Sequence, residues 1–335
     1  MENYYEAQAI SNSGMSNINP EQGGSPAKYK RFVLDRDKPD DDTATLKNGR
    51  LIHKYIEDKD TFKVADITKP SEMMSEWVEE VWGLVDVTFP YPIINEENDT
   101  LRLIVMSARG ERYKSMKEDT VCNKFFKEGL EYLKFLESAQ DKHVITDATR
   151  QILDGVIQGI ERKPLAKKLL FGKTEQLGDV VLKEHPIYWT ETVDDVELSC
   201  KGLIDQLNIS PENRTVELVD GKTTSKAGSL FVNSMRNYRY YRQLAWYKRG
   251  ILHYLSKEYP EITDWKFTCW IVTFETTGFY ECHVYNVLND WICEGQREYS
   301  EILSRIAYHT KANAWELTIE EGVNKGFLNM YYDKD

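Results

Sequence analysis

The segment Val216-Glu217-Leu218-Val219-Asp220-Gly221-Lys222 decides how the second half of this chain is expected to fold. A mainly apolar run that ends in an acid, a glycine and a lysine predicts a strand with polar groups at its end. Side chains alternate faces along a strand, so Asp220 and Lys222 are expected to point the same way, while Gly221 offers only its backbone. A carboxylate and an ammonium group would then share one pocket.

A second acid, Asp205, ends the similar run Lys201-Gly202-Leu203-Ile204-Asp205. Two carboxylates on neighbouring strands suit Mg²⁺, a cation that takes oxygen ligands and is usually shared with substrate phosphate. Taken alone, Asp205 could simply end a strand, and Asp220-Gly221 could simply form a turn. Together with His53, Gln243 and Tyr247 elsewhere in the chain, these residues favour a metal-dependent nuclease site, in which Lys222 would lie beside the attacked phosphorus.

The elements around this segment predict an α/β fold, with a central mixed β-sheet flanked by helices. Strands are expected at 180–182, 187–190, 196–207, 215–223, 265–275 and 279–287, and helices at 45–56, 72–84, 120–138, 146–171, 230–257 and 288–309. The helix at 146–171 is expected to break around Lys163-Pro164. Residues 1–44 are polar and rich in turn-forming residues, so we expect an N-terminal arm there. Residues 45–335 are expected to form one domain, with a helical insertion at about 57–178.

The long helix expected at 230–257 carries Gln243 and Tyr247 on one face, because four residues separate them. Such a pair occurs by chance in many helices, and Tyr247 could be a core residue. Here the pair follows Lys222 by about twenty residues, the length needed to turn and run back across the site.

The same helix combines basic and aromatic side chains, with Arg236, Arg239 and Arg242 interleaved among tyrosines and a tryptophan. This mixture suits a track that holds phosphates and stacks unpaired bases. A solvated helix with an aromatic core side explains it equally well, and we expect one face to do each job.

Two further residues could complete a metal shell. His53 lies on the helix expected at 45–56, and its neutral imidazole could coordinate an ion or orient a metal-bound water. An isolated helical histidine is, however, more often structural. Glu184, on the strand before Asp205, is a candidate further acid, although a solvent-facing strand residue explains it at least as well.

Composition limits the class of protein. The net charge of −12 argues against a general nucleic-acid coat protein, yet an enzyme needs only a local basic track. No run approaches the roughly 18 to 20 apolar residues of a membrane span, and the polar start lacks the pattern of a signal peptide, so a cytoplasmic protein without membrane contact is expected. The five cysteines lack the spacing of zinc or iron–sulfur ligands, so we expect reduced core thiols and no iron–sulfur cluster.

Four short motifs stand in an order that resembles the PD-(D/E)xK nucleases of the RecB and phage-exonuclease type. They are Gly49-x-x-x-His53, Gly202-x-x-Asp205, Asp220-x-Lys222 and Gln243-x-x-x-Tyr247. Residues 9–13, 26–29 and 220–224 also resemble segments of exonuclease VIII (RecE-type) phage recombination exonucleases. The resemblance runs from about residue 5 to 309 and contributes little between about 56 and 178.

The resemblance implies a restriction-endonuclease-like core and hydrolysis of DNA that depends on Mg²⁺, with Mn²⁺ as an alternative. The implied metal ligands are Asp205, Asp220, the Gly221 carbonyl, His53 and, more loosely, Glu184. Lys222 would position or activate the attacking water. Gln243 and Tyr247 would contact DNA or brace the site.

Nucleases similar to exonuclease VIII degrade linear duplex DNA from an end, 5′ to 3′, and leave single-stranded DNA for a recombinase or a single-strand annealing protein. They tend to form rings around DNA. By resemblance, we expect an exonuclease of this kind that acts in recombination, with an annealing protein as partner and a ring-shaped homo-oligomer. An endonuclease of a repair or restriction kind, and a DNA-end-binding protein without nuclease activity, are the alternatives.

Overall fold

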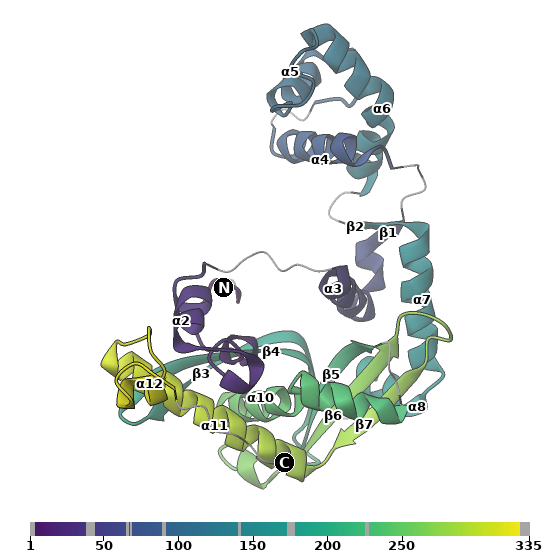
Figure 1. Cartoon of the computed structure of the whole chain (residues 1–335). Helices are drawn as coiled ribbons and strands as arrows, with labels where there is room; N and C mark the ends of the chain where they lie inside the picture. Colours follow the sequence, from purple (N-terminus) through teal and green to yellow (C-terminus); the bar gives the residue numbers. More distant parts are fainter. Residues whose placement is uncertain are drawn as a thin grey trace. The chain divides into compact units, whose positions relative to one another are not determined.

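The computed structural model describes residues 4–37, 44–64, 67, 69–88, 92–139, 142–172, 178–224 and 228–328 (Figure 1). The chain forms two compact units. Unit 1 comprises Met1–His53 and Gly155–Asp335, and unit 2 comprises Lys54–Asp154. The helices α3 (Ala44–Glu57) and α7 (Asp147–Glu161) each contain a boundary between the units, at positions 53/54 and 154/155.

Unit 1 is built on a five-stranded mixed sheet with the strand order β3-β4-β5-β6-β7 (Figure 1). Its strands are β3 (Val180–Val193), β4 (Val196–Ser210), β5 (Thr215–Thr224), β6 (Lys266–Glu275) and β7 (Cys282–Val287). Only β5 and β6 pair in parallel, and the other neighbours are antiparallel. The predicted α/β fold with a central mixed sheet is therefore confirmed.

The first two strands of this sheet form a long hairpin. Val193 pairs with Val196, and the two turn residues between them, Asp194 and Asp195, both have positive φ, at 50° and 64°. This is the geometry of a tight type I′ turn, which aspartate tolerates. The strands expected separately at 180–182 and 187–190 are one strand, because the hairpin continues on both sides of a single irregular position, Glu184.

Two helices, α10 (Tyr240–Leu255) and α11 (Asn289–Ala312), pack against each other and against β3 and β4. Their apolar faces and the sheet enclose the main hydrophobic core of unit 1. The helix α10 lies so near the sheet that a Cβ at Gly250 would fall 2.5 Å from the Trp189 ring. A glycine is needed there because the backbone itself contacts the aromatic side chain.

The single helix expected at 230–257 is wrong in one respect, because the chain turns within it. A short helix α9 (Phe231–Asn237) follows the 3₁₀ turn η4 (Gly228–Leu230), and α10 begins again at Tyr240. Arg239, just before α10, has a φ of 55°. That left-handed conformation interrupts helical hydrogen bonding, so the residues before and after it face different directions.

The N-terminal segment is packed into unit 1 and is not an arm. Ile10 forms a parallel bridge with Cys200: its N–H donates to Ser199 O, and its carbonyl accepts from Lys201 N, both at 2.8 Å. Met15, Ile18 and Tyr29 belong to the core of this unit. The short elements here are α1 (Asn12–Met15), η1 (Pro20–Gln22), α2 (Pro26–Tyr29) and η2 (Lys30–Leu34). The arm expected at 1–44 is thus wrong for residues 4–37, and residues 1–3 and 38–43 lie outside the described residues.

The break predicted around Lys163-Pro164 is present and separates two helices. The helix α7 ends at Glu161, and α8 (Pro164–Phe171) begins with the proline at its first position, where a missing N–H costs no hydrogen bond. The other elements of this unit are η5 (Ile262–Asp264) and α12 (Ile319–Val323).

Unit 2 is a small helical unit with its own core. Three helices, α4 (Glu72–Asp86), α5 (Asp99–Ser107) and α6 (Glu118–Ala139), bury Trp77 and Phe125 among aliphatic side chains. A two-stranded parallel sheet of β1 (Phe62–Val64) and β2 (His143–Ile145) follows the turn η3 (Lys59–Thr61). Unit 2 falls inside the insertion expected at about 57–178 except at its first residues. None of the described helices is long and apolar enough to cross a membrane.

Candidate metal centre

The two predicted aspartates face each other where β4 and β5 separate. The last paired residues of these antiparallel strands on this side are Gln206 and Val219, so the next opposite positions are Asp205 and Asp220. The Gly221 N–H donates to Asp205 Oδ2 at 2.8 Å, which replaces the missing strand partner. The end of the ladder therefore brings the carboxylates together at a point where the backbone no longer fills the space between strands.

The pairing of β3 with β4 is interrupted at the same level. Lys183 pairs with Gln206 and His185 pairs with Ile204, but Glu184, which lies opposite Asp205, is absent from the ladder. Glu184 has a φ of 42°, a left-handed conformation that costs a non-glycine residue about 1–3 kcal/mol. Like charges directly opposite each other on antiparallel strands are also destabilising. A distortion that places two acids together in this way is typical of a binding site.

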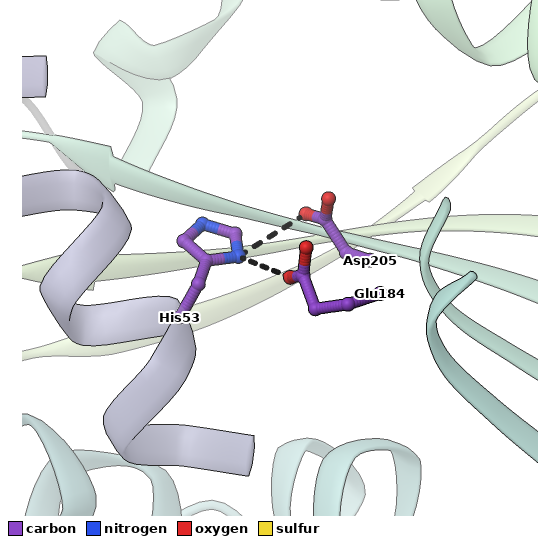
Figure 2. Close-up of side chains that lie close together, drawn as sticks. All are labelled: His53, Glu184 and Asp205. Carbon is purple, nitrogen blue, oxygen red and sulfur yellow. Dashed lines mark ion pairs between the residues drawn. The ribbon is translucent and has the colours of Figure 1, made fainter. Parts of the chain in front are cut away.

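His53 completes a group of three ligand-type side chains (Figure 2). Its Nδ1 lies 3.7 Å from Glu184 Oε1 and 3.5 Å from Asp205 Oδ2, and one ligand atom of each residue lies within 4.8 Å of the other two. The imidazole comes from α3 and the carboxylates come from β3 and β4. One nitrogen and two oxygens fit a divalent cation that keeps further positions for water and substrate. These three residues could therefore hold a metal.

Asp220 and Lys222 point the same way and form an ion pair, as strand alternation predicts. Lys222 Nζ lies 2.6 Å from Asp220 Oδ2. Asp220 is only 1% exposed, and burial raises the pKa of its carboxyl to about 6 against the attraction of Lys222. Burial alone would lower the pKa of Lys222, but Asp220 and Asp205 outweigh it and raise that pKa. Lys222 is thus held as an ammonium group.

One carboxylate oxygen of Asp220 takes no part in this ion pair. Asp220 Oδ1 is buried and has no hydrogen-bond partner among the described residues. A buried carboxylate oxygen without a partner costs free energy unless a cation or a proton satisfies it. This atom fits a ligand to a metal in the neighbourhood of His53, although Asp220 does not belong to the group formed by His53, Glu184 and Asp205. The metal-binding role of Asp220 and that of the Gly221 carbonyl remain predictions.

The predicted pair on the long helix supports the site from α10. Gln243 Nε2 donates to Tyr247 Oη at 2.9 Å. Tyr247 is 8% exposed, and its pKa is raised well above the usual value by burial and then by Asp205 and Asp220. A Cβ at Gly202 would lie 3.1 Å from the Tyr247 ring, so the glycine of Gly202-x-x-Asp205 makes room for this ring. The geometry favours bracing of the site over contact with DNA.

The three arginines predicted to bind DNA have different environments. Arg236 is exposed and lies over the Trp291 ring, with 5.7 Å between its guanidinium carbon and the ring centroid. Arg239 donates to Glu21 and Tyr241 at 2.7 and 2.6 Å and is partly exposed.

Arg242 is fully buried, so the prediction that it binds DNA is contradicted. It faces α11 and the N-terminal segment, where acceptors on Asn12, Ser16, Gln22 and Glu298 take up its donors. This role depends on contacts far apart in the sequence, so helix periodicity could not reveal it.

No protein-family model matches this chain, and neither does any curated protein sequence. Among solved structures, the chain is similar to a crystal structure from Eubacterium rectale described as a "Putative exonuclease". That likeness has 13% sequence identity and a TM-score of 0.46, and it covers 99% of this chain and 95% of the other. The crystal structure of a protein called SSO0001 is 13% identical, with a TM-score of 0.24, over 52% of this chain and 68% of that one. With TM-scores below 0.5, neither likeness carries an argument about function.

Proposed function

We propose that this protein is a metal-dependent deoxyribonuclease that cleaves phosphodiester bonds at the His53, Glu184 and Asp205 centre. One observation carries the proposal: the three ligand atoms lie within 4.8 Å of one another beside a buried carboxylate and an ammonium group. Phosphodiester hydrolysis needs oxygen ligands for a cation and a positive group for the phosphate. The described residues supply both.

The ligand set would hold Mg²⁺ or Mn²⁺, since carboxylates suit both ions and an imidazole is accepted by a transition metal. When bound, such an ion activates water and neutralises charge on the phosphoryl oxygens. Glu184 and Asp205 supply the negative charge that attracts the cation. The imidazole of His53 supplies a neutral third ligand, which keeps the number of carboxylates low enough for a phosphate anion to approach.

The ion pair between Lys222 and Asp220 supports an electrostatic role for Lys222. An amine held in its protonated form cannot remove a proton from water at neutral pH. Lys222 therefore acts as an electrostatic group, which binds a phosphoryl oxygen and stabilises the charge that develops on it. Asp220 holds the ammonium group in place through the 2.6 Å ion pair.

Finer properties follow from the resemblance to RecE-type exonucleases. We propose Mg²⁺ as the working ion and the ends of linear duplex DNA as the substrate, degraded 5′ to 3′ during recombination. A ring-shaped homo-oligomer and a single-strand annealing protein as partner belong to the same proposal. Light scattering of the purified protein tests the ring, because a monomeric mass would contradict it.

Cleavage of matched linear and circular DNA tests the proposed activity. Linear duplexes labelled at either the 5′ or the 3′ end, and a closed circle, are incubated with the protein and Mg²⁺, Mn²⁺ or EDTA. We expect metal-dependent loss of the linear DNA alone, with the 5′ label released first. Equal attack on the circle would indicate an endonuclease. Binding of ends without cleavage under any condition would indicate an end-binding protein and would contradict nuclease activity.

Variants of the two central residues assign the activity to this site. Asp220→Ala is expected to lower the cleavage rate by about 10³-fold or more while leaving DNA binding intact. Lys222→Ala is expected to lower kcat by roughly 10²- to 10³-fold, because it removes a positive group used in the transition state. Glu212→Ala, an exposed acid in the turn after β4, is the matched control and should cleave like the wild type. Full activity of Asp220→Ala would remove this residue from the mechanism.

A further inference from the structure

A row of four aromatic rings runs through α9, α10 and β7. Tyr285 stacks on Phe231 with 5.0 Å between ring centroids, Phe231 stacks on Tyr240 at 5.9 Å, and Tyr240 stacks on Tyr238 at 5.5 Å. The angles between neighbouring planes are 22°, 16° and 28°, so each ring is stacked on the next. The row resembles a short stack of bases.

The two ends of this row differ in exposure. Tyr285 at one end is half-buried and donates a hydrogen bond from its hydroxyl to Gly228 O at 2.9 Å, and its neighbour Phe231 is 3% exposed. Tyr238 at the other end is 64% exposed. One face of its ring lies on Tyr240, which leaves the other face for solvent. An exposed tyrosine ring contributes little to the core, so the fold alone does not require it.

The row also touches the candidate metal centre. Lys222 Nζ lies 5.0 Å from the centroid of the Tyr240 ring. Tyr238 is therefore one ring beyond a side chain that contacts the proposed phosphate-binding lysine. The two steps, 5.5 Å and 5.0 Å, together span no more than about three nucleotides of a stacked strand, at roughly 3.4 Å each.

We propose that Tyr238 is a stacking platform for an unpaired base of the DNA strand whose phosphate Lys222 binds. The inference rests on the proposed nuclease function. Base stacking on an aromatic ring is tolerant of sequence, which suits an enzyme that must process any strand. Arg236, two residues earlier on α9, is also exposed. The break between α9 and α10 is what turns Tyr238 out to solvent while Tyr241 is buried in the core.

Binding of a short single-stranded oligothymidine in EDTA tests the platform without cleavage. Loss of one base stack corresponds to a roughly 5- to 150-fold weaker affinity. We expect this loss in Tyr238→Ala, and we expect Tyr238→Phe to retain wild-type affinity because it keeps the ring. The matched control is Tyr308→Ala, which removes another exposed tyrosine of unit 1 that lies outside the row. Unchanged affinity in Tyr238→Ala, or loss of affinity in Tyr238→Phe, would overturn the proposal.

A photocrosslink identifies the contact directly. One thymine is replaced by 5-iodouracil, which crosslinks to an aromatic ring stacked on it, and the attached peptide is identified by mass spectrometry. A crosslink at Tyr238 is expected, and crosslinks only elsewhere would contradict the stacking. Cleavage of the same oligonucleotide in Mg²⁺ is followed separately. Stacking without any cleavage would refute the nuclease function alone, and cleavage with no effect of Tyr238→Ala would refute the platform alone.

Discussion

Unit 1 contains two clusters of charged side chains, one buried around Arg242 and one partly exposed around Asp205, and they differ in how the charge is balanced. Around Arg242, all three guanidinium nitrogens donate hydrogen bonds, and the acid Glu298 balances the charge at 2.9 Å. Around Asp205, three carboxylates face one ammonium group and one imidazole. The first cluster is balanced in charge, although Glu298 Oε2 has no hydrogen-bond partner among the described residues, whereas the second has an excess of negative charge. Excess charge of one sign marks a place that binds a partner of the other sign.

The largest effect on folding is expected in the charge-balanced cluster around Arg242. Removal of one partner from a buried ion pair costs about 3–5 kcal/mol, because the other charge stays buried. Arg242→Ala should lower the free energy of unfolding by that amount, as measured by urea titration. Arg236→Ala, at an exposed site of the neighbouring helix, is the matched control and should stay within about 0.5 kcal/mol of the wild type. A small loss in Arg242→Ala would remove the distinction between the clusters.

Metal binding to the cluster around Asp205 should stabilise the folded protein. A ligand that binds only the folded state adds about 2.7 kcal/mol at a concentration 100 times its Kd. We expect Mn²⁺ or Mg²⁺ to raise the free energy of unfolding of the wild type by this order, and to leave Asp205→Asn unchanged. Arg242→Ala should keep the gain, because its cluster lies outside the ligand set. The same gain in Asp205→Asn would place the ion elsewhere.

The two clusters also show how far sequence patterns reach. Alternation along β5 was sufficient to predict that Asp220 and Lys222 point the same way, because the rule concerns residues two apart on one strand. Helical spacing likewise paired Gln243 with Tyr247, and their hydrogen bond confirms it. Local rules of this kind need no knowledge of the fold.

Contacts between segments far apart in the sequence could not be predicted from these local patterns. The pairing of Arg242 with Glu298 joins two helices, and the burial of the N-terminal segment depends on scattered apolar residues without periodicity. The position of Glu184 opposite Asp205 follows from the register of the hairpin, which the sequence shows only if the turn at Asp194 is recognised. The pattern identified the acids, and the strand register brought them together.

A methyl group added at Gly221 should test whether His53 binds the metal. A Cβ at Gly221 would lie 3.0 Å from His53 Cε1 and 3.1 Å from Phe274, so in Gly221→Ala both rings must shift by a few tenths of an ångström. We expect a loss of about 1–3 kcal/mol in stability, together with a weaker stabilisation by Mn²⁺. Gly49→Ala, one turn earlier on the helix of His53, is the matched control, since its Cβ would lie at an ordinary 3.8 Å from Thr223. It should gain up to about 1 kcal/mol from helix propensity and bind metal normally. Normal metal binding by Gly221→Ala would exclude His53 as a ligand.

The smallest effect on stability is expected for Glu184→Gln, and its sign should differ with and without metal. Glu184→Gln removes one of two like charges that face each other across β3 and β4, a repulsion worth roughly 0.2–1 kcal/mol. In EDTA this variant should therefore unfold at slightly higher urea than the wild type. In Mn²⁺ it should unfold at lower urea, because a ligand is lost. Glu217→Gln, on β5 opposite the neutral Asn208, is the control and should show neither change. If Glu184→Gln behaved like this control, the strain at Glu184 would have no connection with cation binding.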